Sequence, residues 1–582
     1  MASETNLENI RHSLAHLLAA AVLKKYPKVK LGIGPVIENG FYYDFDLPEA
    51  LTPEDLQDFT KEMRKMINAK LPFSGEEVTA AAATKRMKGQ KYKLELIKDF
   101  SKEDQKLSIY KTGDVFEDLC RGGHVADTSE INAEGFKLDS IAGAYWKGSE
   151  KNAQLQRIYG LAFANKNELE AFLKMREEAQ KRDHRKLGKE LELFEIIDEV
   201  GPGLPLFHPK GAILRRVVEN YITELQESRG YQPIWIPHIT KGELYKISGH
   251  LDKYDAMYPP MKLKDEADYY IKPMNCPHFM MLYKAQQHSY KELPVRWTCT
   301  TTNYRHEKSG ELSGLTRVRS LTQDDCHVFA RPDQIEPEIN LMLDMIEEVY
   351  KKFGFNDFWV RISTRDPNPP AGGSKDKYIG DEKVWQESEE ALARLIQKRG
   401  WKHEIGVGEA AFYGPKLDFI FKDVIGRDWQ LSTIQLDMNL PKRFDLEYTD
   451  TDGTKKAPVV IHRAILGSTE RFLGILIEHY GGAFPAWLAP VQVKIVPISE
   501  KHLAYAEKIK KELVGYRVEI ASENDTLGKK IRNAEKEKVP FLAVVGDKEM
   551  ESGMVSLREH GGKDHGSISV EKLKEMLRSN RE

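Results

Sequence analysis

The pattern of hydrophobic and polar residues divides the chain into stretches of helical and of alternating periodicity. Near the N-terminus, apolar residues at helical spacing predict an amphipathic helix over about residues 7–24. Residues 33–46 are predicted to form a strand, a turn and a strand, and residues 53–68 a charged helix. The segment Lys91–Ile97 alternates and is predicted to be a strand. We therefore expect residues 1–165 to form one compact α+β domain.

The remainder of the chain shows three further patterns. Residues 166–195 are almost all helix formers and are dense in Lys, Arg and Glu. Such a helix is typical of a linker or an RNA-facing arm, and equally of a plain solvated helix. Residues 196–489 combine long amphipathic helices with apolar strands, which predicts a larger domain. In residues 490–582 strands and helices alternate, which predicts a small α/β sheet with mixed connections.

The composition fits a multidomain globular protein. The chain has 582 residues, of which 41% are hydrophobic and 30% charged. Its net charge of -3 provides no overall attraction to nucleic acid, so any RNA contact must come from local patches. Four cysteines argue against a disulfide framework. Because we find neither a basic leader nor a spanning apolar run, we expect a cytoplasmic protein with no membrane partner.

The segment Thr302–Phe329 carries the densest chemistry. Residues two apart in a strand point to the same face, so Arg305 and Glu307 are expected to share one face. The same rule places three polar residues together on the second arm: Gln323, Asp325 and His327. Arg can grip a phosphate through its planar fork, and a carboxylate can accept from an exocyclic amine such as that of adenine. The segment therefore suits a bent nucleoside triphosphate, while the alternative is a salt-bridged surface hairpin.

A second candidate site combines histidines and a cysteine. His12 and His16 lie four residues apart, on one face of the N-terminal helix, and Cys120 and His124 have the same spacing. These four residues offer enough soft or borderline ligands for Zn²⁺, although the Glu of the HExxH metalloprotease pattern is missing. The alternative is two half-buried histidines and an unrelated cysteine.

The order of motifs resembles that of a known family. Residues 211–237, Arg305-His-Glu307 and Gly467–Arg471 resemble the three motifs of class II aminoacyl-tRNA synthetases. The segments PMNCP, RVRSLTQDDCH, AFYGPKLDF, IHRAILGSTERF and FPAWLAPVQV are similar to those of bacterial threonyl-tRNA synthetases in particular. The resemblance covers nearly the whole chain.

This resemblance implies a multidomain fold with an α+β editing domain, an antiparallel-sheet catalytic core and an α/β anticodon-binding domain. The implied limits are 1–165 for editing, 166–195 for a charged helical linker, 196–489 for catalysis and 490–582 for anticodon binding. The implied reaction is ATP-dependent ligation of L-threonine to tRNA(Thr) through threonyl-adenylate. Positioning and charge stabilisation would drive an in-line attack on the α-phosphate. A homodimer is implied by the first motif.

The resemblance also implies residue roles. One Zn²⁺ per subunit is expected on Cys276, His327 and His462, because three protein ligands leave an open position for substrate. Threonine would chelate this metal through its amino and hydroxyl groups, whereas valine lacks the hydroxyl. Mg²⁺ is expected with ATP. The implied catalytic residues are Arg305, Lys416 and Arg471. The implied ATP-binding residues are Arg305, Glu307, Arg317, Gln430 and Arg471. The implied threonine-binding residues are Met274, Gln323, Asp325, Tyr413, Thr433, Gln435 and Ser468.

Serine is the expected error substrate. It keeps the hydroxyl, and losing one methyl is worth only about 1–3 kcal/mol, so a second, hydrolytic site is expected to edit seryl-tRNA(Thr). The implied editing residues are His12, His16, Tyr43, Lys93, Asp118, Cys120 and His124. The family's pocket uses an activated water without an obligatory metal, which replaces the zinc hypothesis for these histidines. The implied anticodon contacts are Asn524, Glu549 and Arg558.

The sequence departs from the family pattern at three points. The ubiquitin-like domain that usually comes first is missing, either in a natural minimal form or in a trimmed chain. His278 stands where the family has Gly, and we expect it to face outward on the surface. The segment Cys120–His124 reads CRGGH, where Pro is common before the His, and we expect a looser loop.

Two alternatives were weighed against the main hypothesis. Synthetases for proline, serine or histidine do not need the Cys276, His327 and His462 set. A non-catalytic paralogue that binds tRNA or mRNA would tend to lose the arginine of the second or third motif, yet Arg305 and Arg471 are both present.

Overall fold

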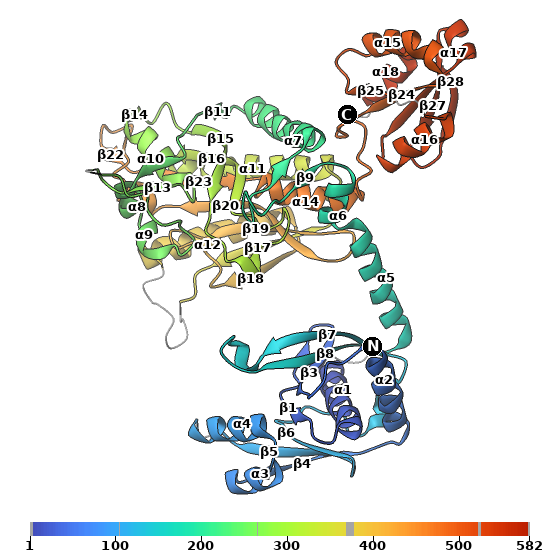
Figure 1. The fold of residues 1–582 in the computed structure, drawn as a ribbon. Helices are drawn as coiled ribbons and strands as arrows, with labels where there is room; N and C mark the ends of the chain where they lie inside the picture. The colour runs from blue at the N-terminus through green and yellow to red at the C-terminus, as the bar shows by residue number, and fades with distance from the viewer. Residues whose placement is uncertain (1–3, 104, 265, 368–377, 522–524, 580–582) are drawn as a thin grey trace. The chain divides into compact units, whose positions relative to one another are not determined.

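The computed structural model describes residues 4–103, 105–264, 266–367, 378–521 and 525–579. Residue contacts divide the chain into two compact units, Met1–Glu177 and Glu178–Glu582, which we describe separately (Figure 1). The division falls inside helix α5 (Lys166–Arg182), within the segment predicted to be a linker. The domain limits given above stay predictions.

Within its described residues, the first unit contains two antiparallel sheets and four α-helices besides α5. In the larger sheet the strand order is β1-β3-β8-β7, with β2 paired to β3. Its strands are β1 (Lys30–Leu31), β2 (Val36–Ile37), β3 (Gly40–Asp46), β7 (Phe136–Tyr145) and β8 (Gln154–Ala162). The smaller sheet consists of β4 (Phe73–Val78), β5 (Leu107–Thr112) and β6 (Phe116–Leu119). The helices are α1 (Glu4–Lys25), α2 (Pro53–Asn68), α3 (Ala80–Arg86) and α4 (Lys91–Lys102).

Helix α1 lies at the centre of the first unit. Its apolar face, which includes Leu14 and Leu18, packs into one core cluster with Phe41 and Phe45 of β3. The predicted helices and the α+β class of this unit are therefore confirmed.

The strand predicted over Lys91–Ile97 is wrong, because this segment begins helix α4. Its seven residues satisfy both periods, since Tyr92 and Lys93 are followed four residues later by Leu96 and Ile97. Tyr92, Lys93 and Ile97 are buried, so the helical spacing is the one that the packing uses.

The second unit is organised around an eight-stranded sheet of order β11-β15-β16-β23-β20-β19-β17-β18. Its strands are β11 (Gln232–Pro233), β15 (Val295–Tyr304), β16 (Ser320–Ala330), β23 (Val459–Ala464), β20 (Asp428–Asp437), β19 (Lys416–Lys422), β17 (Phe358–Thr364) and β18 (His403–Val407). The pairs from β15 to β17 are antiparallel, and the two outermost pairs are parallel.

Helices cover this sheet and build the site beside it. They are α6 (His184–Glu190), α7 (Pro209–Ser228), α8 (Gly242–Ser248), α9 (His250–Lys253), α10 (Cys276–Lys284), α11 (Ile335–Lys352), α12 (Glu382–Arg399), α13 (Leu440–Arg443) and α14 (Thr469–Tyr480). Short strands form three separate small sheets: β9 (Phe194–Glu195) with β10 (Leu206–Phe207), β12 (Ile239–Lys241) with β13 (Tyr269–Ile271), and β14 (His288–Ser289) with β21 (Tyr448–Thr449) and β22 (Lys455–Lys456). The expected extended conformation through Arg305 and Glu307 is wrong, because β15 ends at Tyr304 and a loop of residues 305–319 follows.

The C-terminal part of this unit forms a mixed sheet of order β25-β24-β26-β27-β28. Its elements are β24 (Val493–Pro497), α15 (Leu503–Glu512), β25 (Val518–Ile520), α16 (Leu527–Lys536), β26 (Phe541–Val545), α17 (Asp547–Ser552), β27 (Met554–Glu559), β28 (Asp564–Ser569) and α18 (Val570–Ser579). The α/β prediction is confirmed, with α17 and β28 added.

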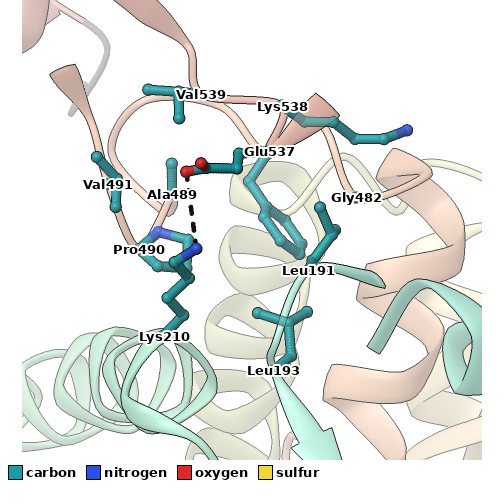
Figure 2. A pocket seen from close by; sticks show the side chains of 11 residues that line it. Leu191, Leu193, Lys210, Gly482, Ala489, Pro490, Val491, Glu537, Lys538 and Val539 are labelled. Carbon is teal, nitrogen blue, oxygen red and sulfur yellow. Dashed lines mark ion pairs between the residues drawn. The ribbon is translucent and has the colours of Figure 1, made fainter. Parts of the chain in front are cut away.

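A cavity of about 30 Å³ is lined by Leu191, Leu193 and Lys210 near the start of α7 and by residues that flank this sheet, such as Val491 and Val539 (Figure 2). Glu537 lies 3.6 Å from Lys210 of α7 and 2.9 Å from the buried Lys494 of β24, so its carboxylate joins the two parts. Within the described residues, no helix is long and apolar enough to cross a membrane. The cytoplasmic location stays a prediction.

Candidate active site

A cysteine and two histidines meet at the centre of the eight-stranded sheet. His327 of β16 lies directly opposite His462 of β23 in the antiparallel register. The Nδ1 atom of His462 is 2.8 Å from Nε2 of His327, and Sγ of Cys276, the first residue of α10, lies within 4.8 Å of both rings. All three residues are buried. We call this group the triad (Cys276, His327 and His462).

The surroundings of the triad fit a metal ion. The Nε2 atom of His462 lies 3.0 Å from Oδ2 of Asp437, which leaves Nδ1 turned toward the other two ligands. Such a carboxylate orients a metal-binding imidazole and raises its basicity. Among the described residues, Nδ1 of His327 has no hydrogen-bond partner and lies 3.7 Å from Oδ1 of Asp325. One thiolate and two imidazoles form a donor set that Zn²⁺ prefers, with one position open.

Beside the triad, the buried Asp325 is held by residues that the sequence analysis did not single out. Asn275 donates from Nδ2 to Oδ2 of Asp325 at 2.9 Å. Lys272 donates to Oδ1 of Asn275 at 2.9 Å and to Oγ1 of Thr301 at 2.8 Å. Because an ammonium group only donates, Lys272 fixes which end of the amide faces Asp325. The signal that could have found Lys272 is its place next to PMNCP.

A cleft of about 680 Å³ opens next to these residues. Four predicted residues line it: Met274, Arg305, Tyr413 and Gln435. The hydroxyl group of Tyr413 donates to Oε1 of Gln435, and the Tyr413 ring lies 5.3 Å from that of His462. His250 and Tyr254 also line the cleft, although the sequence analysis did not name them.

Three arginines predicted to bind ATP come close together. Arg471, in the first turn of α14, donates from Nε to the carbonyl oxygen of Thr316 at 2.9 Å. Arg317 pairs with Glu307 at 2.9 Å, within the 305–319 loop. Burial first, and then repulsion from Arg305 and Arg317, lowers the pKa of Arg471. A bound anion would relieve this repulsion.

The other predicted residues lie around a buried carboxylate and the start of α14. Asp418 pairs with Lys416, and it accepts from Nε2 of Gln430 at 2.8 Å and from Oγ1 of Thr433 at 3.1 Å. Gln323 donates to the carbonyl oxygen of Gly467 at 3.1 Å. The hydroxyl group of Ser468 caps α14 by accepting from the Arg471 N–H at 3.2 Å.

The first unit contains a second polar pocket, of about 490 Å³. His12, His16, Cys120 and His124, which we call the tetrad, come within 4.8 Å of one another. The thiol of Cys120 lies 3.4 Å from Nε2 of His12 and 3.2 Å from Nε2 of His124. Burial lowers the pKa of His124 to about 3 and raises the pKa of Cys120 to about 11, so these groups are neutral near pH 7.

The remaining predicted editing residues form a buried ion pair in the same pocket. Lys93 of α4 lies 2.8 Å from Asp118 of β6, and both side chains are 3% exposed. The hydroxyl group of Tyr43 donates to the same carboxylate. The fold therefore brings the seven predicted residues close together, while their role in editing stays a prediction.

The structure corrects the expected position of His278 and explains the glycine before His124 in the CRGGH loop. His278 is buried rather than outward-facing, and within the described residues neither ring nitrogen has a hydrogen-bond partner. It lies in the first turn of α10, where the five residues 276–280 are all buried. The position of His278 on the helix therefore did not indicate whether it faces solvent. In the CRGGH loop, Gly123 has φ +82°, a conformation that proline cannot adopt, so this loop requires the glycine found here.

Two of the three predicted anticodon contacts, Glu549 and Arg558, lie among the described residues of the C-terminal domain. Glu549, in α17, accepts from the N–H of Gly546 at 3.0 Å. Arg558, on β27, is 48% exposed and lies 3.6 Å from Asp564. Asn524 lies outside the described residues.

Three family models match the chain. They are the "tRNA synthetase class II core domain (G, H, P, S and T)" over residues 261–480, the "Anticodon binding domain" over residues 492–580 and the "Threonyl and Alanyl tRNA synthetase second additional domain" over residues 107–159. The antiparallel sheet with its arginine-rich loop, together with these matches, defines a class II aminoacyl-tRNA synthetase.

Curated relatives narrow this class. The chain is 50% identical to a threonine--tRNA ligase of Gloeobacter violaceus, over 97% of this chain and 91% of that protein. It is 47% identical to one of Streptomyces avermitilis, over 98% of this chain and 88% of that protein. The chain belongs to the threonine--tRNA ligase family.

Solved structures agree with this assignment. The structure described as the RNA binding domain of threonyl-tRNA synthetase from Cryptosporidium parvum has a TM-score of 0.64 and 35% identity, over 68% of this chain and 98% of that one. A threonyl-tRNA synthetase described as ThrRS-1 from Aeropyrum pernix has a TM-score of 0.59 and 29% identity, over 69% of this chain and 97% of that one.

Proposed function

We propose that this chain ligates L-threonine to tRNA(Thr) with ATP, through threonyl-adenylate, in the cleft beside the triad. The observation that carries the proposal is the register that sets His327 opposite His462, with Cys276 within reach and Asp325 next to them. Zn²⁺ bound by the triad would supply Lewis-acid coordination of the amino and hydroxyl groups of threonine. One Zn²⁺ per subunit is proposed.

The residues around the triad have distinct proposed roles. Asp325 accepts from the threonine ammonium group, while Tyr413 and Gln435 line the cleft around its side chain. Arg305, Arg317 and Arg471 bind the phosphates of ATP, which Mg²⁺ would help to neutralise. Their charges stabilise the pentacoordinate α-phosphorus while the threonine carboxylate attacks it and the bond to the leaving pyrophosphate breaks. Further residues with proposed contacts to substrate are Met274, Glu307, Gln323, Lys416, Gln430, Thr433 and Ser468.

Amino-acid-dependent exchange of pyrophosphate into ATP tests this proposal. We expect strong exchange with threonine, weaker exchange with serine and almost none with valine, which lacks the hydroxyl group. Zinc is assayed on the same sample, with about one ion per chain expected. Exchange that proceeds equally well with valine would overturn the proposed role of the triad.

We further propose that the pocket of the first unit hydrolyses seryl-tRNA(Thr). The tetrad is neutral near pH 7 and borders an open pocket, so it can hold and orient a water for attack on the ester. Lys93, Asp118 and Tyr43 form the polar wall of this pocket. The test is deacylation of seryl-tRNA(Thr) by a His12→Ala variant, whose threonine exchange stays unchanged. Undiminished deacylation in that variant would contradict the proposal.

Two proposed partner contacts lie further from the cleft. Trp235, beside edge strand β11, is 79% exposed and Ile239 is 51% exposed, which supports a homodimer through this edge. A Trp235→Asp variant that sediments as a monomer, where the wild type is a dimer, would support this contact.

Asn524, Glu549 and Arg558 are proposed to read anticodon bases. Arg558→Ala is expected to weaken tRNA charging but not threonine exchange.

A further inference from the structure

The segment predicted to be a linker contains a buried histidine. His184, the first residue of α6, is 3% exposed. It lies between the end of α14 and the 305–319 loop, to which Arg317 belongs. The helix begins there because the side chain of Asp183 caps it, accepting from the N–H of Arg185 at 2.8 Å. The predicted linker (residues 166–195) is therefore buried at His184, where it contacts α14 and the 305–319 loop.

The hydrogen bonds of His184 define its tautomer. The backbone N–H of Leu315 donates to Nε2 at 3.0 Å, so this nitrogen carries no proton. The proton is therefore on Nδ1, which donates to Oε1 of Glu478 at 2.6 Å. The backbone N–H of His184 donates to the same oxygen at 3.1 Å. Both nitrogen atoms of the neutral ring are thus paired with partners 131 and 294 residues away in the chain.

The fit around His184 is close enough to require glycine in the loop. Gly314 has φ +46°, and a Cβ atom there would lie 2.2 Å from Nε2 of His184. On the α14 side, a Cβ atom on Gly474 would lie 3.3 Å from Cβ of Leu315 and 3.5 Å from the His184 ring. The loop is thus held against α6 and α14 with little room to shift.

The loop segment at His184 leads directly to two phosphate-binding arginines. Thr316, which follows Leu315, accepts through its carbonyl oxygen from Nε of Arg471 at 2.9 Å. Arg317 comes next and faces Glu307. A displacement at Leu315 therefore moves the carbonyl group that orients Arg471 and the backbone that carries Arg317.

We infer that His184 is a positioning residue for ATP, because its Nε2 atom holds the 305–319 loop at Leu315 and so keeps Arg317 and Arg471 aimed at the triphosphate. This inference rests on the proposed function of the cleft. It assigns to the segment predicted as a linker a part in ATP binding rather than a spacing role alone.

Two conservative substitutions separate the two hydrogen bonds. In His184→Gln, the amide oxygen can take the place of Nε2 and accept from Leu315. In His184→Asn, the amide nitrogen can take the place of Nδ1 and donate to Glu478, but nothing reaches Leu315. In threonine-dependent pyrophosphate exchange, we expect His184→Asn to raise the KM for ATP about tenfold, since a buried N–H is left unpaired. His184→Gln should raise it less than about threefold, and the KM for threonine should change less than about twofold in both variants.

Other outcomes would overturn the inference. Equal increases of the KM for ATP in the two variants, or a KM for threonine that rises as much as that for ATP, would reduce His184 to a structural residue. Gly314→Ala pushes the loop from the other side and should reproduce the ATP-specific effect, so it carries the test if His184→Asn does not fold. A wild-type chain without threonine exchange would instead defeat the proposed function, and normal exchange with unchanged KM values in all variants would defeat this inference alone.

Discussion

The triad and the tetrad are built from the same residue types but have different surroundings. In each, a cysteine and histidines come within 4.8 Å of one another. Behind the triad stand carboxylates, with Asp437 at 3.0 Å from His462 and Asp325 at 3.7 Å from His327. In the tetrad, His12 and His124 contact Cys120, His124 also contacts Ser13, and His12 has backbone hydrogen bonds at Gly122 and Gly123.

The charges near the two groups also differ: near the tetrad Lys93 is paired with Asp118, whereas Asp437 contacts an imidazole of the triad directly. Burial lowers the pKa of His16 well below its ordinary value, and the neighbouring His124 and His12, followed by Lys93, lower it further. A nearby ammonium group opposes the binding of a cation, whereas carboxylates behind imidazoles favour it. Cysteine and histidine side chains alone therefore do not identify a metal site. The charged groups that contact these side chains determine whether the site favours a metal ion or a water molecule.

The largest effect is expected from a substitution that removes one ligand of the triad and leaves the tetrad intact. Cys276→Ser removes the thiolate, and we expect loss of zinc together with a fall in threonine exchange of at least about a hundredfold, since loss of an outer partner alone costs about 10–100-fold. The matched control is Cys120→Ser, which should keep both the zinc and the exchange. Loss of zinc in Cys120→Ser instead would show that the tetrad, and not the triad, binds the metal.

The next effect concerns the charge beside the tetrad. Lys93→Met removes the partner of the buried Asp118, which lies 2.8 Å away. Deacylation of seryl-tRNA(Thr) should fall about a hundredfold, in the range of a lost acid–base or orienting group, while threonine exchange stays normal. A control with Lys106→Met, at the exposed rim of the same pocket, should change deacylation little. Equal losses in both variants would mean that general charge attraction for RNA explains the effect.

A smaller effect tests the carboxylate side of the comparison. Lys272→Met removes the donor that orients Asn275 toward Asp325. We expect the KM for threonine to rise about tenfold because a hydrogen bond to a charged group is lost, with the KM for ATP and the zinc content unchanged. A KM for ATP that rises in parallel would show that Lys272 supports the sheet rather than Asp325.

The smallest effect is the pH dependence of stability. The pKa of His124 is lowered by burial from 6.5 to about 3, so between these pH values the unfolded state binds a proton that the folded state does not. The free energy of unfolding therefore falls as the pH is lowered from about 6.5. A His124→Phe variant keeps a ring against Phe73 and loses this proton, so its melting temperature should fall less between pH 7 and pH 5, by a few degrees. An identical fall in the wild type and the variant would contradict the assigned pKa direction.

Much of the fold and of the two sites could be predicted from the sequence, because motif residues at fixed spacings pointed to one family. Long periodic stretches such as α1 and α2 were also predicted correctly. The segment Lys91–Ile97 was not, since seven residues satisfy two periods and tertiary packing chooses between them.

Other features depend on contacts between residues distant in the chain. His184 meets Leu315 and Glu478 across 131 and 294 residues, and no local pattern encodes either pairing. Lys272 reads as an ordinary surface lysine until the fold buries it completely. The expected surface position of His278 failed for the same reason, because burial is set by the elements that pack over α10.

X-ray absorption at the zinc edge of the purified wild-type chain tests the central claim most directly. If the triad binds Zn²⁺, we expect about one zinc per chain, with one sulfur at about 2.3 Å and two nitrogens at about 2.0–2.1 Å. A further light ligand should come from solvent or from added threonine. We also expect an unchanged spectrum for Cys120→Ser. A spectrum with three nitrogens and one sulfur that is lost in Cys120→Ser would place the metal in the tetrad and contradict the account.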